Sequence, residues 1–404
     1  MNSLNPKLLL LGGSHAEIPL ILAAKELGYY VITTGNDQKG LGHSYANKNI
    51  FADFSDKKAM LELATTEKID AICSGCNDFA LLSTAYVAEK LSLPGHDSYE
   101  IAKQIHHKDK YRKLAESLEI PTPQSIRIST IEELEKNISS LQFPIIIKPV
   151  DLTGGKGIQR ADSIEEAKSA FTIAMEKTRE NYCIAEEFIE GTRHGFSCYI
   201  HQEEVVFYFA DNEQYFLNQY LVSGANTPST SSQNTLEMLK EYSERIAKKL
   251  HLVDGILHIQ YIEKDNGIPF IIEVCRRPPG DLYIKLVKHA TQLDYPKMLV
   301  LAETGRANES LILDNFSFFS PYRKPRCVLR HCIMTKEKGK IKGIYFAKEI
   351  QNKIIDSFLW YKEKEFIEDP LHDKAGIVFL CFDSKNEMEY YTENISDYIK
   401  IIFE

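Results

Sequence analysis

A lysine and a glycine-rich turn follow one another in residues 143–158, which read FPIIIKPVDLTGGKGI. The three isoleucines predict a short buried strand, and Lys148 at its end needs an anionic partner. Lys156 lies in the turn, among glycines whose backbone N–H groups can approach a phosphate without an intervening Cβ. These glycines are Gly154, Gly155 and Gly157. The pattern indicates polyphosphate binding, and a hairpin loop without a ligand is the alternative.

The turn does not have the spacing of a P-loop. A P-loop needs glycine where Val150 stands and serine or threonine where Gly157 stands. We therefore expect a hairpin that covers a ligand, not an anion-binding turn between a strand and a helix.

A second group of polar residues lies on two later strands, predicted over 255–263 and 269–274 and joined by the turn KDNG. His258 and Gln260 belong to the first strand, and Glu273 and Cys275 to the end of the second. Residues two apart on a strand share a face, so these side chains can converge on one point. The segment RRPPGD follows directly and is too rich in arginine and proline for an ordinary helix start.

Two adjacent acids, Glu186 and Glu187, lie in the predicted strand 182–189. Neighbouring residues on a strand point to opposite faces, so one of the two must point inward. An exposed edge strand with paired carboxylates is the alternative.

Alternating strands and helices precede these residues and must position them. Strands over 7–13, 29–34 and 69–74 alternate with helices over 18–27, 57–67 and 79–91, which is typical of a doubly wound parallel sheet. The first turn, GGSHAE, lacks the full G-x-G-x-x-G fingerprint, so a nicotinamide site is only weakly indicated. A small carboxylate or phosphate at the helix start, assisted by Ser14 or His15, is another interpretation of this turn.

The rest of the chain divides at the sequence IPTP, residues 120–123, which ends a helical region over 98–118. Residues 125–182 predict a compact α+β unit that is small enough to move as a lid. The stretch 211–232 is rich in Asn, Gln, Ser and Thr and predicts a long mobile or substrate-facing loop. The tail predicts short strands, a β segment over 375–383 and a helix over 387–398.

Bulk composition limits the classes of function. A chain of 404 residues with 44% hydrophobic residues predicts two to four packed units. The net charge of −9 argues against nonspecific binding to nucleic acid or to anionic membrane. No window approaches a membrane span and the N-terminus does not resemble a signal peptide, so we expect a cytoplasmic protein. Eight cysteines in so long a chain do not predict disulfides, and the Cys73–Cys76 pair lacks the second pair that a zinc site needs.

Taken in order, these features resemble the ATP-grasp superfamily, in particular the carboxylate-amine ligases related to biotin carboxylase and to L-amino-acid ligases. The resemblance covers nearly the whole chain. It rests on the doubly wound start, a lysine ahead of the IP-x-P break, IIIKP with its glycine-lysine loop, the EEFI-x-G strand and the late E-x-x-x-R-P-P-G-D.

The resemblance implies an α/β and α+β architecture in three parts. Residues 1–108 would form a doubly wound N-terminal domain, and 109–320 an ATP-grasp domain whose mobile lid covers about 122–183. Residues 321–404 would form a small C-terminal α+β domain.

The resemblance also implies a role for each matching residue. Lys108 and Lys148 match the two lysines that contact ATP phosphates, and Thr153, Gly154, Gly155, Lys156 and Gly157 match the phosphate lid. Glu186, Phe188 and Ile189 match the strand that reads adenine, the first by its side chain and the others chiefly through backbone groups. His194 matches a ribose-side position. Glu273 matches the principal Mg²⁺ ligand, and Arg277 the arginine that steadies the acyl-phosphate, so Arg277 and Lys156 are the expected catalytic residues.

Two residues depart from the pattern of the family. Gln260 stands where the family commonly has Glu, and Cys275 where it commonly has Asn. Mg²⁺ prefers hard oxygen ligands, so the Gln260 amide and the Cys275 thiol are poor replacements for the carboxylate and the amide of the family at the metal positions. One carboxylate can suffice for one ion that also takes nucleotide oxygens, and two-metal catalysis is in question.

The leading hypothesis is an ATP-dependent ligase that activates a small carboxylate as an acyl-phosphate, which an amine then captures. A nucleotide-binding regulatory or partner protein of the same fold with weakened catalysis is the alternative, and a dehydrogenase comes third. Glycinamide ribonucleotide ligation, carbamoyl-phosphate-type chemistry and dipeptide formation all remain open, as does assembly into a homodimer.

Overall fold

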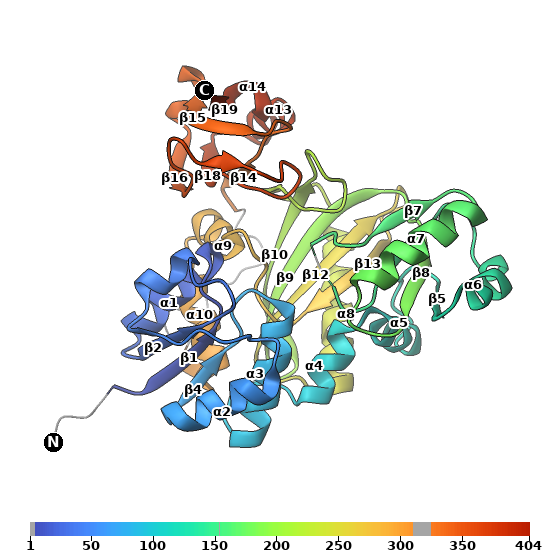
Figure 1. The fold of residues 1–404 in the computed structure, drawn as a ribbon, viewed down its shortest axis with the longest axis horizontal. Coiled ribbons are helices and arrows are strands. Elements are labelled where there is room, and N and C mark those ends of the chain that lie inside the picture. The colour runs from blue at the N-terminus through green and yellow to red at the C-terminus, as the bar shows by residue number, and fades with distance from the viewer. Residues whose placement is uncertain (1–4, 153, 310–324) are drawn as a thin grey trace.

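The structure is a computed structural model that describes residues 5–152, 154–309 and 325–404 (Figure 1). Thr153 and the predicted domain boundary at 320/321 lie outside the described residues. No helix within the described ranges is long and apolar enough to cross a membrane.

The first sheet is parallel and has the strand order β3-β2-β1-β4. Alternate residues of β1 enter two different cores, because Leu8 and Leu10 pack with α1 while Leu9 and Leu11 pack against α2 and α3. The sheet is therefore covered on both faces, which confirms the doubly wound prediction. Its elements are β1 (Lys7–Leu11), α1 (Ile18–Glu26), β2 (Tyr30–Thr34), β3 (Lys48–Asn49), α2 (Lys57–Glu67), β4 (Ala71–Cys73) and α3 (Asp78–Leu91).

Two helices lead from this sheet to the next unit. They are α4 (Tyr99–His106) and α5 (Lys108–Ser117). The predicted helical region thus breaks at His107, whose backbone is extended, and Lys108 is the first residue of the second helix.

The predicted lid region is a four-stranded antiparallel sheet of order β5-β8-β6-β7 that carries two helices on one side (Figure 1). Strands β6 and β7 pair directly across the glycine turn, so the turn is a hairpin as expected. The elements are β5 (Ser125–Ile128), α6 (Ile131–Asn137), β6 (Ile145–Pro149), β7 (Gln159–Ala161), α7 (Ile164–Lys177) and β8 (Cys183–Glu187).

An eight-stranded antiparallel sheet of order β13-β12-β9-β10-β11-β14-β18-β16 runs through the middle of the molecule. Its strands are β9 (Thr192–His201), β10 (Glu204–Gln214), β11 (Gly224–Thr227), β12 (Gly255–Glu263), β13 (Pro269–Cys275), β14 (Cys327–Ile333), β16 (Ile354–Leu359) and β18 (Gly376–Phe382). Helix α8 (Gln233–Leu250) packs on one face through Leu239 and Ile246. Helices α9 (Tyr283–Thr291) and α10 (Tyr295–Glu303) share a core with α1 of the first sheet.

The predicted loop over 211–232 is wrong in part. Strand β10 continues to Gln214, and residues 224–227 form β11, which is buried and joins β10 to β14. Polar side chains hid these strands from the hydrophobic pattern, because Asn212 and Asn226 satisfy each other by a 2.7 Å hydrogen bond across the pair.

The C-terminal strands enter the large sheet and also form a small sheet of order β17-β15-β19. The elements outside the large sheet are β15 (Gly339–Phe346), α12 (Lys348–Gln351), β17 (Phe366–Ile367), α13 (Lys385–Glu393), α14 (Ile395–Tyr398) and β19 (Ile399–Phe403). This part sits above the first sheet in Figure 1. The predicted β segment and the predicted helix near the C-terminus are both present, the helix in two pieces.

Candidate active site

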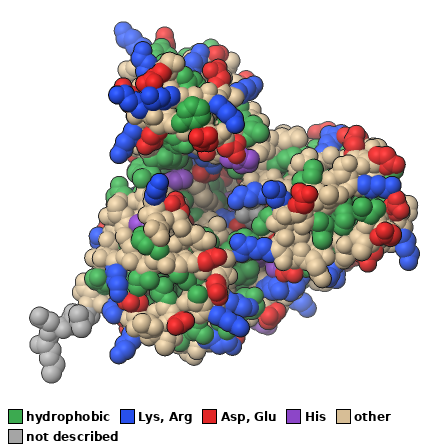
Figure 2. All heavy atoms as spheres, viewed as in Figure 1, with side chains coloured by type: hydrophobic (Ala, Val, Ile, Leu, Met, Phe, Trp, Pro, Cys, Tyr) green, Lys and Arg blue, Asp and Glu red, His purple; other side chains and the backbone are tan. Residues whose placement is uncertain are grey.

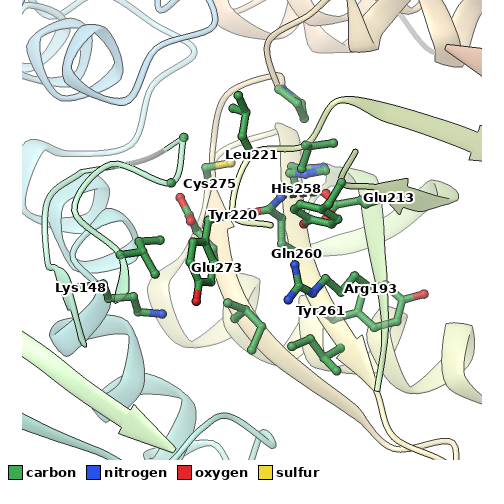
Figure 3. A pocket seen from close by; sticks show the side chains of 18 of the residues that line it. Lys148, Arg193, Glu213, Tyr220, Leu221, His258, Gln260, Tyr261, Glu273 and Cys275 are labelled. Carbon is green, nitrogen blue, oxygen red and sulfur yellow. Dashed lines mark hydrogen bonds between the residues drawn. The ribbon is translucent and has the colours of Figure 1, made fainter. Parts of the chain in front are cut away.

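A cavity of about 350 Å³ opens between the lid sheet and the large sheet. The molecule is visibly hollowed between its parts, with basic side chains beside the hollow (Figure 2). Figure 3 shows Lys148 reaching into the cavity from the lid side, opposite side chains of β12 and β13. Many of the predicted site residues line this cavity, including Lys108, Lys148, Gly154, Gly155, Glu186, Phe188, Ile189, Gln260, Glu273, Cys275 and Arg277.

The lid-side wall carries a buried group of opposite charges. The Lys148 Nζ lies 2.5 Å from Oε2 of Glu186, and the Arg112 Nε donates to Oε1 of the same carboxylate at 2.8 Å. Lys108 is 3% exposed, and its Nζ donates to the Leu152 carbonyl at 2.6 Å. Two cations therefore contact the Glu186 carboxylate, and Lys108 adds a third positive charge to this wall.

Burial governs the protonation of these groups. Burial, together with the nearby Arg112 and Lys108, lowers the pKa of Lys148 to about 8, although Glu186 opposes the change. For Glu186 burial alone would raise the pKa, but Arg112 and Lys148 outweigh it and lower the pKa. Glu186 is therefore ionised and fixes the position of Lys148.

Some of the hydrogen-bonding groups at the strand end after Glu186 already have partners within the protein. The Phe188 N–H donates to the Pro144 carbonyl at 3.0 Å, and the Arg160 guanidinium lies 4.7 Å from the centre of the Phe188 ring. The Glu186 side chain is held by cations, so neither it nor the Phe188 N–H is open to a base. The Ile189 N–H has no hydrogen-bond partner among the described residues and remains available at the cavity edge.

The glycine turn lies over the cavity. Gly154, Gly155 and Gly157 have φ values of +69°, +76° and +73°, which explains why glycine occupies these positions. A Cβ on Gly155 would lie 2.8 Å from the Tyr220 carbonyl oxygen, so the turn approaches the segment after β10 closely. Lys156 is exposed, and neither it nor Gly157 belongs to the cavity lining. The expected catalytic lysine of the turn thus does not line the cavity.

The predicted metal residues meet on the large sheet. Gln260 pairs with Glu273 across β12 and β13, and His258 pairs with Cys275, as the alternation predicts. Glu273 has no hydrogen-bond or ion-pair partner within the described parts of the chain, so its carboxylate is open to a cation. The Gln260 Nε2 donates to Oε1 of Glu213 at 2.8 Å.

Cys275 does not fit a magnesium site. Burial raises the pKa of its thiol to about 12, so the sulfur stays protonated. No group of three acidic, histidine or cysteine residues suited to a metal occurs in the ranges that the structure describes. The donor set fits one Mg²⁺ held by Glu273 with help from ligand oxygens, and it does not fit two.

Arg277 lines the cavity and is anchored from the first unit. Its Nη2 and Nε lie 2.5 Å and 3.1 Å from the two carboxylate oxygens of Asp78, the first residue of α3. His106 Nδ1 lies 3.4 Å from the same carboxylate. Burial would raise the pKa of Asp78, but Arg277 and His106 lower it instead. The bidentate pair fixes the plane of the guanidinium.

The expected ribose contact by His194 does not agree with the structure, because this side chain is buried outside the cavity lining. His194 is 1% exposed, is absent from the cavity lining and stacks on Tyr261 at 5.1 Å. The neighbouring Arg193 lines the cavity instead, and its Nη1 donates to the Gln219 carbonyl. Successive residues on a strand alternate between faces, so a match that is off by one position selects the opposite face.

The first turn has no room for a dinucleotide or a free anion. A Cβ on Gly13 would lie 2.0 Å from Cε1 of His43, so the histidine ring fills the space above the glycines. The Glu17 carboxylate accepts from the Ser14 N–H at 2.8 Å and from the Cys76 N–H at 3.0 Å. The protein's own carboxylate therefore occupies the anion position at this helix start.

Six charged residues that line the cavity were not predicted as site residues, namely Glu187, Arg193, Asp211, Glu213, Asp281 and Arg330. Asp211 and Glu213 belong to the part of β10 that was expected to be a loop, Arg193 precedes His194, and Arg330 lies on β14. The spacing of two between Asp211 and Glu213 was the available signal for a shared strand face. Arg330 belongs to no recognisable sequence motif, and it reaches the cavity only because β14 joins the large sheet.

Comparison with known proteins matches the middle of the chain to a known domain. Residues 113–279 match the family model described as the ATP-grasp domain. Over 280 residues the chain is 27% identical to a phosphoribosylamine–glycine ligase of Leptospira interrogans, which covers 62% of this chain and 63% of that protein. The match thus spans less than two thirds of that relative.

Solved structures match the fold over nearly the full length. A phosphoribosylglycinamide synthetase of Anaerococcus prevotii superposes with a TM-score of 0.78 at 24% identity, over 99% of this chain and 100% of that chain. An L-amino acid ligase of Bacillus licheniformis superposes with a TM-score of 0.82 at 19% identity, over 99% of both chains.

Proposed function

We propose that this chain, whose residues 113–279 match the ATP-grasp domain, is an ATP-dependent ligase that forms a carbon–nitrogen bond between a small carboxylate and an amine. One observation carries the proposal. A single cavity has buried cations on its lid wall and, on the facing sheet, the open carboxylate of Glu273 beside Arg277. This is the charge arrangement that phosphoryl transfer from a nucleotide requires.

Binding of the triphosphate is assigned to the lid wall. Lys108 and Lys148 neutralise phosphate oxygens, while Glu186 and Arg112 keep Lys148 in place. The turn at Gly154 and Gly155 covers the phosphates and excludes water, which would otherwise hydrolyse a reactive intermediate. The Ile189 N–H is the donor available to the base.

The reaction would proceed in two steps. A carboxylate oxygen of the substrate attacks the γ-phosphorus, the bond to the β-phosphate oxygen breaks and ADP departs. The amine then attacks the carbonyl carbon of the acyl-phosphate, and phosphate leaves. Arg277 faces the negative charge that develops on the transferring group, and its ion pair with Asp78 holds it ready. A bound Mg²⁺ would supply further charge neutralisation next to Glu273.

Trapping with hydroxylamine tests this function without knowledge of the amine. The protein is incubated with ATP, Mg²⁺, hydroxylamine and each member of a panel of amino acids and small carboxylates, and hydroxamate and ADP are measured. We expect ATP-dependent hydroxamate with at least one carboxylate. We also expect Lys148→Met to reduce its formation at least about 100-fold, while Lys336→Met, on a turn of the C-terminal part, leaves it unchanged. Absence of hydroxamate with every carboxylate would contradict the proposal.

A catalytically weakened nucleotide-binding protein is the second candidate, because Gln260 and Cys275 stand at the metal positions and the Cys275 thiol stays protonated. Calorimetry distinguishes the two candidates, since ATP binding with weak Mg²⁺ dependence and no turnover favours the second. Gln260→Glu with Cys275→Asn should create or raise turnover in a weakened site and change little in a specialised one. The cytoplasmic location and the homodimer stay predictions.

A further inference from the structure

One line of residues crosses four strands of the large sheet on the cavity side. Glu273 pairs with Gln260, Gln260 with Gly195, and Gly195 with Asp211. Directly paired residues share a face, so Asp211 lies on the same face as the predicted metal residues, two strands from Gln260. The cavity lining includes Asp211.

Gly195 creates the space that Asp211 uses. A Cβ at position 195 would lie 2.8 Å from Oδ2 and 3.0 Å from Oδ1 of Asp211. The Asp211 carboxylate therefore leans over β9, toward Gln260. Gly195 does not have a positive φ, so its backbone conformation would accept alanine, and the nearest atoms that an added Cβ would meet belong to this carboxylate.

Only one carboxylate oxygen of Asp211 accepts a hydrogen bond from the residues that the structure describes. Tyr283 on α9 donates its hydroxyl to Oδ2 at 2.7 Å, whereas Oδ1 is buried and has no hydrogen-bond partner among the described residues. Asp211 is 1% exposed. A buried carboxylate oxygen without a donor is costly, so a donor from a ligand is expected at this point of the cavity.

A buried arginine lies across the same face. Glu213 pairs with Ala225 of β11, and Ala225 pairs with Arg330 of β14, so the arginine and both acids face the cavity. Arg330 is 3% exposed, its Nη1 donates to the Asp281 carbonyl at 2.8 Å, and its Nε is buried without a partner in the described chain. The small side chain of Ala225 leaves the space between them open.

We propose that Asp211 and Arg330 form the subsite of the amine substrate and that this substrate is a free α-amino acid. Its ammonium group would bind Oδ1 of Asp211 beside Glu213, and its carboxylate would bind Arg330. Asp211 would be a catalytic residue that takes the ammonium proton. The inference rests on the proposed ligase function and adds the chemical class of the amine to it.

The proton transfer completes the chemistry of the second step. An ammonium group has no lone pair, so one proton must pass from nitrogen to Asp211 before the amine attacks. The carbon–nitrogen bond then forms, the bond between the carbonyl carbon and the phosphate oxygen breaks, and the second proton leaves nitrogen with the departing phosphate. Glu213 already receives hydrogen bonds from Gln260 and Tyr215, so Asp211 is the acid with a free oxygen.

The surroundings of Asp211 suit a proton acceptor at neutral pH. Burial, reinforced by Glu213, raises its pKa to about 7, while Tyr283 and Arg330 oppose the change. The charged and titratable groups that face it are Glu213 and Tyr215 from β10 and the segment after it, Tyr261 from β12, Tyr283 from α9 and Arg330 from β14.

Hydroxylamine separates this inference from the proposed function, because it is neutral at pH 7 and needs neither the base nor the arginine. With a carboxylate that gives hydroxamate, the twenty amino acids are tested as acceptors. For the best acceptor, Asp211→Asn should lower kcat at least about 100-fold and remove the rise of kcat with pH near 7, while hydroxamate formation is unchanged. Glu204→Gln, an exposed acid on the same strand, should change neither rate.

Gly195→Ala provides a variant that keeps every charge. Its added Cβ displaces the Asp211 carboxylate, so it should reproduce the loss with amino acids and spare hydroxamate. Hydroxamate formed by a protein that accepts no amino acid would overturn the inference and leave the ligase function standing. So would equal loss of both products in Asp211→Asn together with a reduced affinity for Mg²⁺, which would assign Asp211 to the metal.

The arginine is tested with paired amines. L-alanine and ethylamine differ by the carboxylate, as do glycine and methylamine. A charge-assisted hydrogen bond to Arg330 should favour each amino acid over its amine about 10- to 100-fold in kcat/KM. Arg330→Met should reduce that preference without affecting hydroxamate. Equal use of alanine and ethylamine by the unaltered protein would refute the zwitterion subsite even if the variant fails to fold.

Discussion

At the scale of single residues, the site depends on buried charges that hold one another. Glu186 lies between Arg112 and Lys148 and is 2% exposed. A lone carboxylate in such a place would be strongly destabilising, but two cations keep it ionised. The alternation of Glu186 and Glu187 predicted one inward acid, and the structure places Glu186 inward, with Lys148 as its partner.

Nucleotide affinity should depend on pH through Lys148. Its pKa is about 8, so the lysine is charged below pH 8 and loses its positive charge above it. Phosphates favour the charged form, and the ATP dissociation constant measured by calorimetry should rise about tenfold between pH 7 and pH 9. Lys148→Arg, which stays charged, should remove this dependence. An affinity that is flat over this range in the unaltered protein would contradict the assignment of Lys148 to the phosphates.

Adjacent arginines after β13 have different partners. Arg277 faces the cavity, whereas the Arg276 Nε lies 2.7 Å from Oδ2 of Asp97 and its Nη2 donates to the Val253 carbonyl at 2.6 Å. The motif RRPPGD does not indicate which arginine faces the cavity, because the partners Asp78 and Asp97 lie far from both arginines in the sequence. Folding alone determines which arginine meets which acid.

Arg276→Met should destabilise the protein. It leaves Asp97 buried without its cation, which typically costs about 3–5 kcal/mol in the free energy of unfolding. Urea denaturation followed by circular dichroism measures this change. Arg245→Met, which removes an exposed pair with Glu241, should cost about 1 kcal/mol or less. Equal effects of the two substitutions would show that the Asp97 pair contributes nothing special.

At the scale of elements, strand pairing assembles the cavity wall. The hairpin of β12 and β13 was predictable from its turn and brought Gln260 opposite Glu273. The last part of β10, residues 211–214, was not predictable from hydrophobic alternation, because its cavity-side residues are acids and its other residues are polar. A strand that lines a polar cavity loses the apolar pattern by which strands are recognised.

The glycine turn can be tested as an element. Gly155→Ala places a Cβ on a residue with a positive φ, which costs about 1–2 kcal/mol in conformational energy. The added Cβ also clashes with the Tyr220 carbonyl. Gly154→Ala has the same strain, but no atom lies within 4 Å of its Cβ. We expect Gly155→Ala to raise the KM for ATP about tenfold relative to Gly154→Ala, because only the first prevents the turn from settling over the cavity. Equal KM values would exclude a role for the contact with Tyr220.

At the scale of the whole molecule, three distant segments meet beside the cavity. His15 of the first turn stacks on Trp360 of the C-terminal part with ring centres 4.2 Å apart, and its Nε2 lies 3.6 Å from Asp281. Lys374 lies 2.5 Å from the same aspartate. The first unit, the loop after β13 and the C-terminal part are thereby joined at one point.

Trp360 is the single tryptophan of the chain and reports on this junction. His15→Ala removes the stacked ring, so tryptophan emission should shift to longer wavelength as water reaches Trp360, and stability should fall by about 1 kcal/mol. His15→Phe should preserve both properties. Steady-state fluorescence and urea denaturation measure them, and an unchanged spectrum in His15→Ala would show that the stack does not persist in solution.

The sequence by itself determined the features that depend on neighbours along the chain. These are the doubly wound start, the glycine hairpin after Lys148, one inward acid in the pair of Glu186 and Glu187, and the facing pair of Gln260 and Glu273. Each follows from a local period or a turn, which needs no knowledge of distant segments.

Tertiary structure alone decided the rest, because it depends on which distant strands become neighbours. Arg330 reaches the cavity only through the pairing of β14 with β11, and the space for Asp211 exists only because Gly195 lies beside it on β9. Arg193 lines the cavity and His194 does not, because a shift of one position along a strand moves a side chain to the opposite face. A sequence motif fixes which residues are present, while the pairing of the sheet fixes which face they share.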